Sequence, residues 1–440
     1  MQKNDMIMIS VDDHLVETPD LFRKHIASKF KDSAPRVVRF ANGEERWLLE
    51  GKPLAAIAPA VVAGRNKDEF GMEPMRFDQV RKGTWDIDGR IDDMNANGVI
   101  ASMNFANMPG FGGEAFIRGS DKALMLAVVE AYNNWHVDDW CAKHPGRMIP
   151  NAILPLWDVD LAVAEVNRMG KKGVTAVCFL ENTVAFGLPS IHNGYWDPLF
   201  KAVVDNGMVV TIHIGTAGGP MFSPSLESPA DVTNSLINIA VAIPVADFVF
   251  SPLFRKFPEL TVVMSEGCIG WVPFLRERAD AAYVNHRYWT HQDFGDQLPS
   301  DIIDKHFVFC FHDDKCGLEM RHKVGIDRIT WESDYPHSDS TWPNSPEILW
   351  ECVHDYPDDE INKITHLNAM RVLRFDPFKH IRKEDATVGA LRAQAQRDGV
   401  DVTPKSMGGK KPTISGSVMT QGDVVKLFEA APLGEPVATL

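Results

Sequence analysis

The chain has 440 residues, of which 45% are hydrophobic and 24% charged. This length suits one large domain with an appendage, or about two to three average domains. The 45 Lys and Arg against 60 Asp and Glu give a net charge of −15, which on average repels nucleic-acid phosphates and anionic membranes. We therefore expect neither nucleic acid nor a membrane among its partners.

The cysteines and the N-terminus predict a cytoplasmic location. Six cysteines are scattered without CxxC spacing, and several lie in apolar runs, which is typical of buried free thiols in a reducing compartment. The N-terminal MQKNDMIMISVDDH lacks the apolar stretch of a secretory signal. Since a bilayer span needs roughly 20 apolar residues and we find no such window in the sequence, we expect no membrane span.

Short β-rich runs recur along the chain, and each is followed by a helical or irregular stretch. We find eight: Met6–Val11, Val99–Asn104, Met148–Leu154, Val174–Phe179, Met208–His213, Leu260–Met264, Phe307–Phe311 and Arg328–Glu332. Strand–helix alternation through eight strands predicts an α/β fold and favours a distorted TIM (β/α)8 barrel over an open doubly wound sheet, which stays an alternative.

Two segments do not fit this alternation. Residues 21–85 are too long for a simple connection after the first strand, and Pro35–Leu54 within them is predicted to form an inserted hairpin or lid. We expect a barrel domain over residues 1–385 and a C-terminal extension over 386–440. The polar extension, with its GGKKPTISGS stretch, is predicted to be either a flexible tail or an arm that packs on a neighbouring subunit.

Ligand-type side chains stand at the ends of four predicted strands. In a barrel the carboxyl ends of all strands meet at one face, where catalytic groups lie. The first strand ends with Asp12 and His14, two residues apart and so on one side of the strand. The fifth ends with His213, the sixth leads to Glu266, and the eighth to Asp334.

Each of these residues has an ordinary structural interpretation. A single histidine at a strand end is more often a hydrogen-bonded structural residue than a ligand, and Asp12 and Asp334 could be turn or loop residues. The coincidence of the D-x-H pair, the histidine and the aspartate at one face favours a site for a single divalent cation. Imidazole nitrogen with carboxylate oxygen suits zinc first and manganese second.

Further candidates lie in the loops around this face. Glu17 is placed to orient His14, and His337 to line the pocket. His192 and Trp196 are placed to contact a substrate, with loop packing as the alternative. Arg287, within a His-Arg-Tyr-Trp run, is placed to hold an anionic aromatic substrate in its own or an adjacent subunit, although a helix end followed by packing aromatics explains it too.

Four stretches resemble one family: ISVDDHLVETPDLF, VVTIHIGT, FPELTVVMSEGCIGWVPFLRERAD and RITWESDYPHSDSTWP. Their order and content are similar to the amidohydrolase-2 branch of the metal-dependent amidohydrolases, which includes aminocarboxymuconate-semialdehyde and γ-resorcylate decarboxylases. The resemblance runs from about residue 7 to about residue 375 and implies a distorted TIM barrel.

The resemblance also implies roles for single residues. It places metal ligands at Asp12, His14, His213 and Asp334, with Asp334 also taking part in proton transfer. Decarboxylases of the family commonly carry a histidine after the sixth strand, whereas this chain has Glu266. That departure leaves open whether Glu266 takes the acid–base role. Family members are often homodimers or homotetramers.

The sequence thus predicts an enzyme that acts on a small carboxylated molecule, and it leaves open whether that molecule is aromatic. Non-oxidative decarboxylation is the leading hypothesis, and hydrolysis of an amide, ester or lactone needs the same ligands. The third hypothesis is a catalytically silent barrel with a binding role. Retention of all four ligand-type residues speaks against it.

Overall fold

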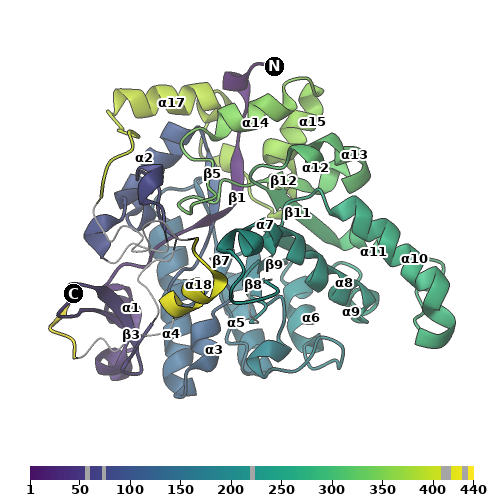
Figure 1. Cartoon of the computed structure of the whole chain (residues 1–440), viewed down its shortest axis with the longest axis horizontal. Helices are drawn as coiled ribbons and strands as arrows, with labels where there is room; N and C mark the ends of the chain where they lie inside the picture. The colour runs from purple at the N-terminus through teal and green to yellow at the C-terminus, as the bar shows by residue number, and fades with distance from the viewer. Residues whose placement is uncertain (55–59, 72–75, 219–222, 408–417, 429–434) are drawn as a thin grey trace.

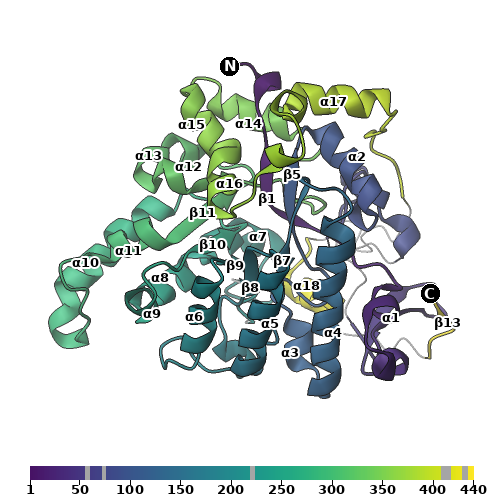
Figure 2. The same cartoon turned by 180° about the vertical axis from the view of Figure 1, so that it is seen from behind.

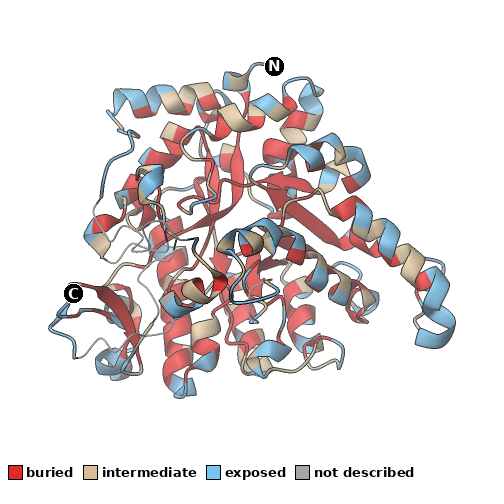
Figure 3. Ribbon diagram, viewed as in Figure 1, coloured by how far each residue is buried: buried red, intermediate tan, exposed pale blue. Residues whose placement is uncertain are grey.

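A computed structural model describes residues 1–54, 60–71, 76–218, 223–407, 418–428 and 435–440. Buried parallel strands occupy its centre (Figures 1 and 3). Each of the eight predicted runs overlaps at least one strand, and the third is split at Pro150, which has no N–H to donate. The strands are β1 Ile9–His14, β5 Ala101–Phe105, β6 Met148–Ile149, β7 Asn151–Ala152, β8 Ala176–Phe179, β9 Val209–His213, β10 Val262–Ser265, β11 Phe307–Phe311 and β12 Ile329–Trp331.

The parallel strands form two sheets rather than one continuous ladder. One sheet has the order β1-β5-β6 and the other β12-β11-β10-β9-β8-β7. Single hydrogen bonds join β1 to the end of β12: the His14 N–H donates to the Tyr335 carbonyl at 2.7 Å, and the Asp334 N–H to the Asp12 carbonyl at 3.0 Å. A register shift in β1 between Ser10 and Asp13 accompanies this seam. The predicted distorted barrel is confirmed, with a seam at the first and last strands.

Helices cover the outside of the barrel, and α5 and α6 pack side by side there (Figure 2). Capping defines several helix starts; in α5, the Asp158 carboxylate accepts from the N–H groups of Asp160 and Leu161. The helices before β10 are α1 Leu21–His25, α2 Ile87–Asn97, α3 Glu114–Arg118, α4 Lys122–Trp135, α5 Val159–Lys171, α6 Asp197–Asp205, α7 Ala230–Ala240, α8 Ala242–Phe250 and α9 Leu253–Lys256. Those after it are α10 Val272–Thr290, α11 Pro299–His306, α12 Lys315–Glu319, α13 Arg321–Val324, α14 Ser345–Val353, α15 Asp358–Asn362, α16 Asn368–Val372, α17 Val388–Arg397 and α18 Gln421–Phe428.

One stretch corrects an expectation from the sequence. Ala230–Phe250, made of α7 and α8, is long and apolar enough by length and composition to cross a membrane, with a mean hydropathy of 1.6. The expectation that no such window exists was therefore wrong. Only 39% of this window is buried. Asn238 of α7 donates to the Glu266 carbonyl at 2.6 Å, so this stretch borders the loop that follows β10.

The segment after β1 forms a small antiparallel sheet beside the barrel. Its strands are β2 Arg36–Arg39, β3 Glu45–Leu49 and β4 Lys52–Pro53, and β13 Ala438–Thr439 from the C-terminal end pairs with β2. Trp47 of β3 is fully buried and meets the ring of Phe22 in α1 edge-on at 5.6 Å. The inserted strands thus share the main hydrophobic core.

The described parts of the C-terminal extension pack on their own chain. α17 lies against α2 (Figure 1), and the Val388 N–H donates to the Met6 carbonyl at 2.8 Å. At α18, the Thr233 hydroxyl of α7 donates to the Gln421 side chain at 2.8 Å. The GGKKPTISGS stretch lies outside the described residues.

Candidate metal centre

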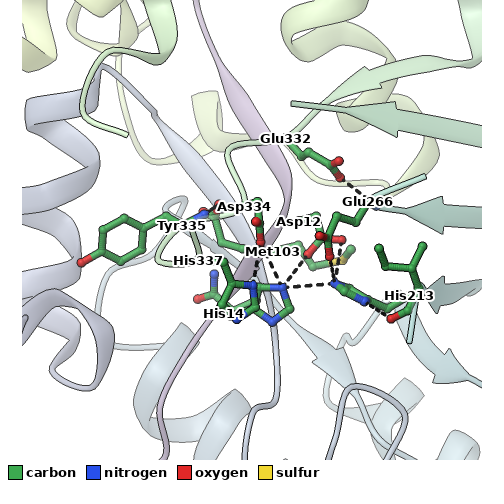
Figure 4. A network of polar contacts seen from close by, with 12 residues as sticks. Asp12, His14, Met103, His213, Glu266, Glu332, Asp334, Tyr335 and His337 are labelled. Carbon is green, nitrogen blue, oxygen red and sulfur yellow. Dashed lines mark hydrogen bonds and ion pairs between the residues drawn. The ribbon is translucent and has the colours of Figure 1, made fainter. Parts of the chain in front are cut away.

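Four buried side chains converge at the carboxyl ends of β1, β9 and β12 (Figure 4). The Nε2 atom of His14 lies 3.1 Å from Nε2 of His213, 3.4 Å from Oδ1 of Asp334 and 3.5 Å from Oδ1 of Asp12. The Nε2 atom of His213 lies 3.4 Å from Oδ2 of Asp12. Such separations are those expected between atoms that surround one ion at about 2.0–2.2 Å.

The hydrogen bonds that these side chains make, and those that they lack, are consistent with a bound cation. His213 Nδ1 lies 2.6 Å from the Ile214 carbonyl, and an N–H there leaves the Nε2 lone pair free. Both oxygens of Asp12 and Oδ2 of Asp334 are buried without a hydrogen-bond partner among the described residues. Burial of unpaired carboxylate oxygens is costly unless a cation compensates. Asp12, His14 and His213 therefore fit one divalent metal ion, and Asp334 adjoins them through His14.

The pKa shifts of these groups differ in direction and so distinguish their roles. Burial, reinforced by the charge of His337, lowers the pKa of His14, so its imidazole is neutral and able to act as a ligand. Burial and the carboxylates of Glu332 and Asp334 raise the pKa of Asp12 well above its usual value. For Asp334, burial acts upward, but the imidazoles of His337 and His14 prevail and hold its pKa below the usual range.

Glu266 adds a further carboxylate to this cluster. Its Oε2 lies 3.1 Å from Nε2 of His213, and 13% of its side chain is exposed. Its backbone has a φ of 58°, in the left-handed region, and is held there by two hydrogen bonds: its N–H donates to Glu332 at 3.2 Å and its carbonyl accepts from Asn238. Burial and the charge of Asp334 raise its pKa well above the ordinary value.

Three neighbouring residues were not identified from the sequence. Glu332 lies two residues before Asp334, and the alternation of a strand was the signal that placed both on one side. Its carboxylate accepts from the Cys310 thiol and lies 3.7 Å from Nδ1 of His312. Burial alone lowers the pKa of His312, but Glu332 outweighs it and raises that pKa to about 9. Cys310 carries no signal, because the run around it is typical only of a buried strand, whereas His312 follows the end of the predicted strand Phe307–Phe311 and shares the strand-end signal of His213.

Two rings close over the ligand-type side chains. Nδ1 of His337 lies 2.9 Å from Oδ1 of Asp334, and its ring centroid is 3.9 Å from that of His14. Phe111 lies 4.6 Å from the ring of His14 and 4.1 Å from that of His213. Glu17 does not contact His14; it accepts from the N–H groups of residues 107 and 108, each at 2.9 Å, and so anchors the loop that carries Phe111.

The remaining candidates make their contacts elsewhere. His192 is exposed and pairs with Asp247 at 2.8 Å. Trp196 is buried against the ring of Phe179, and its indole N–H donates to the Pro189 carbonyl. Arg287, near the end of α10, lies over the rings of Tyr283 and Tyr288. The structure does not bring these three side chains into the cluster around His213.

Comparison with solved structures shows the same fold. An amidohydrolase from Mycobacterium avium subsp. paratuberculosis is 20% identical, with a TM-score of 0.67 over 83% of this chain and 99% of that one. The 5-carboxyvanillate decarboxylase LigW from Sphingomonas paucimobilis is 17% identical, with a TM-score of 0.58 over 84% and 99%. A 5-carboxyvanillate decarboxylase from Novosphingobium aromaticivorans, solved with manganese and 4-hydroxy-3-methoxy-5-nitrobenzoic acid, is 16% identical, with a TM-score of 0.60 over 85% and 99%.

Sequence comparison places the chain in a family. No curated protein matches it. The family model described as amidohydrolase matches residues 34–375 of the 440, which covers three of the four motifs; the first motif, at residues 9–22, precedes the match. The chain belongs to the amidohydrolase family.

Proposed function

We propose that the protein is a metal-dependent decarboxylase of a small aromatic acid that carries a hydroxyl group next to its carboxylate. The observation that carries this proposal is the convergence of Asp12, His14 and His213, with 3.1–3.5 Å between their ligand-type atoms, and the position of Asp334 Oδ1 at 3.4 Å from His14 Nε2. Two solved structures with the same fold are 5-carboxyvanillate decarboxylases, and one holds manganese beside a hydroxylated nitrobenzoic acid. They support both the reaction class and the aromatic substrate.

The chain's own residues suit this reaction. When bound, a divalent ion supplies positive charge that orients and polarises the carboxylate and the hydroxyl of the substrate. Loss of carbon dioxide leaves the electron pair of the broken C–C bond on the ring carbon, which must then take a proton. Glu266 is partly exposed beside His213, and burial with the charge of Asp334 raises its pKa well above the ordinary value, which favours the protonated form. It is therefore our candidate for the proton donor.

Asp334 is the second participant in proton transfer. His337 contacts its Oδ1 at 2.9 Å and His14 the same oxygen at 3.4 Å, so the carboxylate is ionised and fixed in direction. In this state Asp334 accepts a hydrogen bond from the substrate hydroxyl, whose acidity a bound divalent ion would raise, while Glu266 supplies a proton to the ring carbon. The pair thus offers one base and one acid at a single site.

Hydrolysis of an amide, ester or lactone is the second candidate function. The same ligand set serves it, and the solved structure from Mycobacterium avium subsp. paratuberculosis, with a TM-score of 0.67, carries the name amidohydrolase rather than decarboxylase. In that case Asp334 would take a proton from water. A silent barrel with a binding role is the third, and the unpaired buried oxygens of Asp12 and Asp334 count against it.

One experiment separates these functions. The metal content of the purified protein is measured, and zinc- and manganese-loaded samples are incubated with hydroxybenzoates, small amides and lactones while carbon dioxide and acid release are followed separately. Carbon dioxide from a hydroxybenzoate, absent in Asp334→Asn, is the expected result. Acid without carbon dioxide identifies a hydrolase. No bound metal after reconstitution overturns both enzymatic hypotheses.

We also propose that the protein works as a homo-oligomer. We propose further that it is located in a reducing compartment, the cytoplasm. All six cysteines are free. The end of α10 extends away from the body of the molecule (Figure 1), and Val284, Tyr288 and Trp289 on it are 53%, 79% and 70% exposed. Exposed apolar side chains of this size are typical of contact surfaces. Light scattering after size exclusion tests this, since a monomer at micromolar concentration would contradict it.

A further inference from the structure

A second cavity opens at the end of the barrel opposite the candidate metal centre. It has a volume of about 270 Å³ and is lined by residues at the starts of β9 and β11, just before β10 and β12, and around α16. Because the barrel strands are parallel, the starts of β9 and β12 lie a full strand length away from His213 and Asp334. The cavity therefore belongs to a different site.

Positive charge dominates the lining of this cavity. Four basic residues (Lys305, Arg328, Arg371 and Arg374) and two acidic residues (Glu259 and Asp327) border it, which is a local charge of +2. One of the acids is already engaged, since Asp327 pairs with Lys363 at 2.9 Å. The protein as a whole carries −15, so this is a cationic concavity on an anionic molecule.

The guanidinium groups are held in place at the cavity, but the acidic residues of the lining do not cancel their charge. Arg371 donates to the backbone carbonyl of Asp327. Arg374 lies against Gly207, where a Cβ atom would collide with its Nη1 and displace that side chain. Arg328 is half-buried, and among the described residues neither it nor Arg374 has a hydrogen bond or ion pair from its side chain. Burial lowers the pKa of Arg328, and the cations Arg371 and Arg276 act with it, although the carboxylates of Asp304 and Asp327 act in the opposite direction.

We infer that this cavity binds a phosphate group, from inorganic phosphate or from a small phosphomonoester. Arginine forks match the oxygens of phosphate in pairs, and a phosphate dianion compensates the local charge of +2. The volume admits a phosphate with a short organic substituent. Binding here is independent of the proposed decarboxylation, because none of the lining residues belongs to the metal centre.

Calorimetric titration of the metal-loaded protein with sodium phosphate, at an ionic strength held constant with sodium chloride, tests this inference. The wild type is compared with Arg328→Gln/Arg374→Gln and with Arg397→Gln, which removes an exposed arginine of α17 outside the cavity. We expect the double variant to bind phosphate at least about tenfold more weakly, because removing one charge-assisted hydrogen bond weakens binding by about this factor. Arg397→Gln should bind as the wild type does.

Equal phosphate affinity in the wild type and the double variant overturns the inference, since phosphate would then bind elsewhere, for instance at the metal. Because Arg328 is half-buried, Lys305→Gln/Arg374→Gln, which changes only exposed side chains, repeats the test if the first variant unfolds. Glycerol phosphate distinguishes the two sources: tighter binding than phosphate points to a phosphomonoester, and equal or weaker binding to inorganic phosphate. Succinate binding as tightly as phosphate would also overturn the inference, because the site would then lack phosphate chemistry.

Discussion

The Nε2 atoms of His14 and His213, from two different sheets, face each other at 3.1 Å. The approach of His213 Nδ1 to the Ile214 carbonyl leaves a lone pair on its Nε2, so no proton of His213 bridges the two nitrogens. Carboxylate oxygens of Asp12 lie 3.4–3.5 Å from both nitrogens, so Asp12, His14 and His213 surround a common point, and Asp334 lies 3.4 Å from His14. A shared cation explains it better than a hydrogen-bond network does.

His213→Ala should lower metal occupancy, because one of four ligands is removed. Elemental analysis after reconstitution with one equivalent of zinc or manganese measures the effect. His192→Ala is the matched control, since that histidine pairs with Asp247 at the surface, and its occupancy should equal that of the wild type. Unchanged occupancy in His213→Ala would remove this residue from the ligand set.

Asp334→Asn should leave the fold intact and reduce turnover by between about a hundredfold and ten-thousandfold, the range typical of removing an acid–base group. The amide cannot accept a proton, although its oxygen can still lie beside His337. Steady-state kinetics with circular dichroism as the folding control provides the measurement. Turnover near that of the wild type would exclude Asp334 from the chemistry.

Glu266→Gln should separate proton donation from metal binding. The amide preserves the size of the side chain but carries no acidic proton, so we expect metal content close to the wild-type value and a much lower kcat. The pH profile of kcat should lose its alkaline limb, because in the wild type activity falls when the Glu266 carboxyl deprotonates. A profile with the same limb in the variant would assign it to another group.

His136 should make the protein less stable at acidic pH. It lies in the π-helical turn His136–Cys141, and burial lowers its pKa from 6.5 to about 4. The unfolded state binds a proton below pH 6.5, whereas the folded state binds it only near pH 4. The stability that this neutral imidazole contributes is thus fully present above pH 6.5 and is lost as the pH falls towards 4.

Urea unfolding at pH 7 and pH 5 measures this effect. Between these values the wild type should lose about 2 kcal/mol through His136. His136→Gln cannot titrate, so its free energy of unfolding should change less over the same interval. Equal losses in the two proteins would show that His136 does not control the acid response.

Strand positions were predictable from the sequence because buried parallel strands are continuous apolar runs. The split of the third strand at Pro150 and the seam at β1 were not, since backbone hydrogen bonds between distant segments leave no local pattern. Asp12, His14, His213 and Asp334 were predictable as a group because strand ends meet at one face of a barrel. Loop residues such as His192 were not, because the direction of a loop depends on its packing.

The seam between β1 and β12 links occupancy of the metal centre to the opening of the barrel. Asp12 and His14 belong to the sheet on one side of the seam, while His213 and Asp334 belong to the other. An ion bound by all four residues would cross-link the two sheets. Removal of the ion should then loosen this seam, so amide hydrogen exchange in the edge strand β1 should accelerate on demetallation more than exchange in β8, which lies between two neighbouring strands.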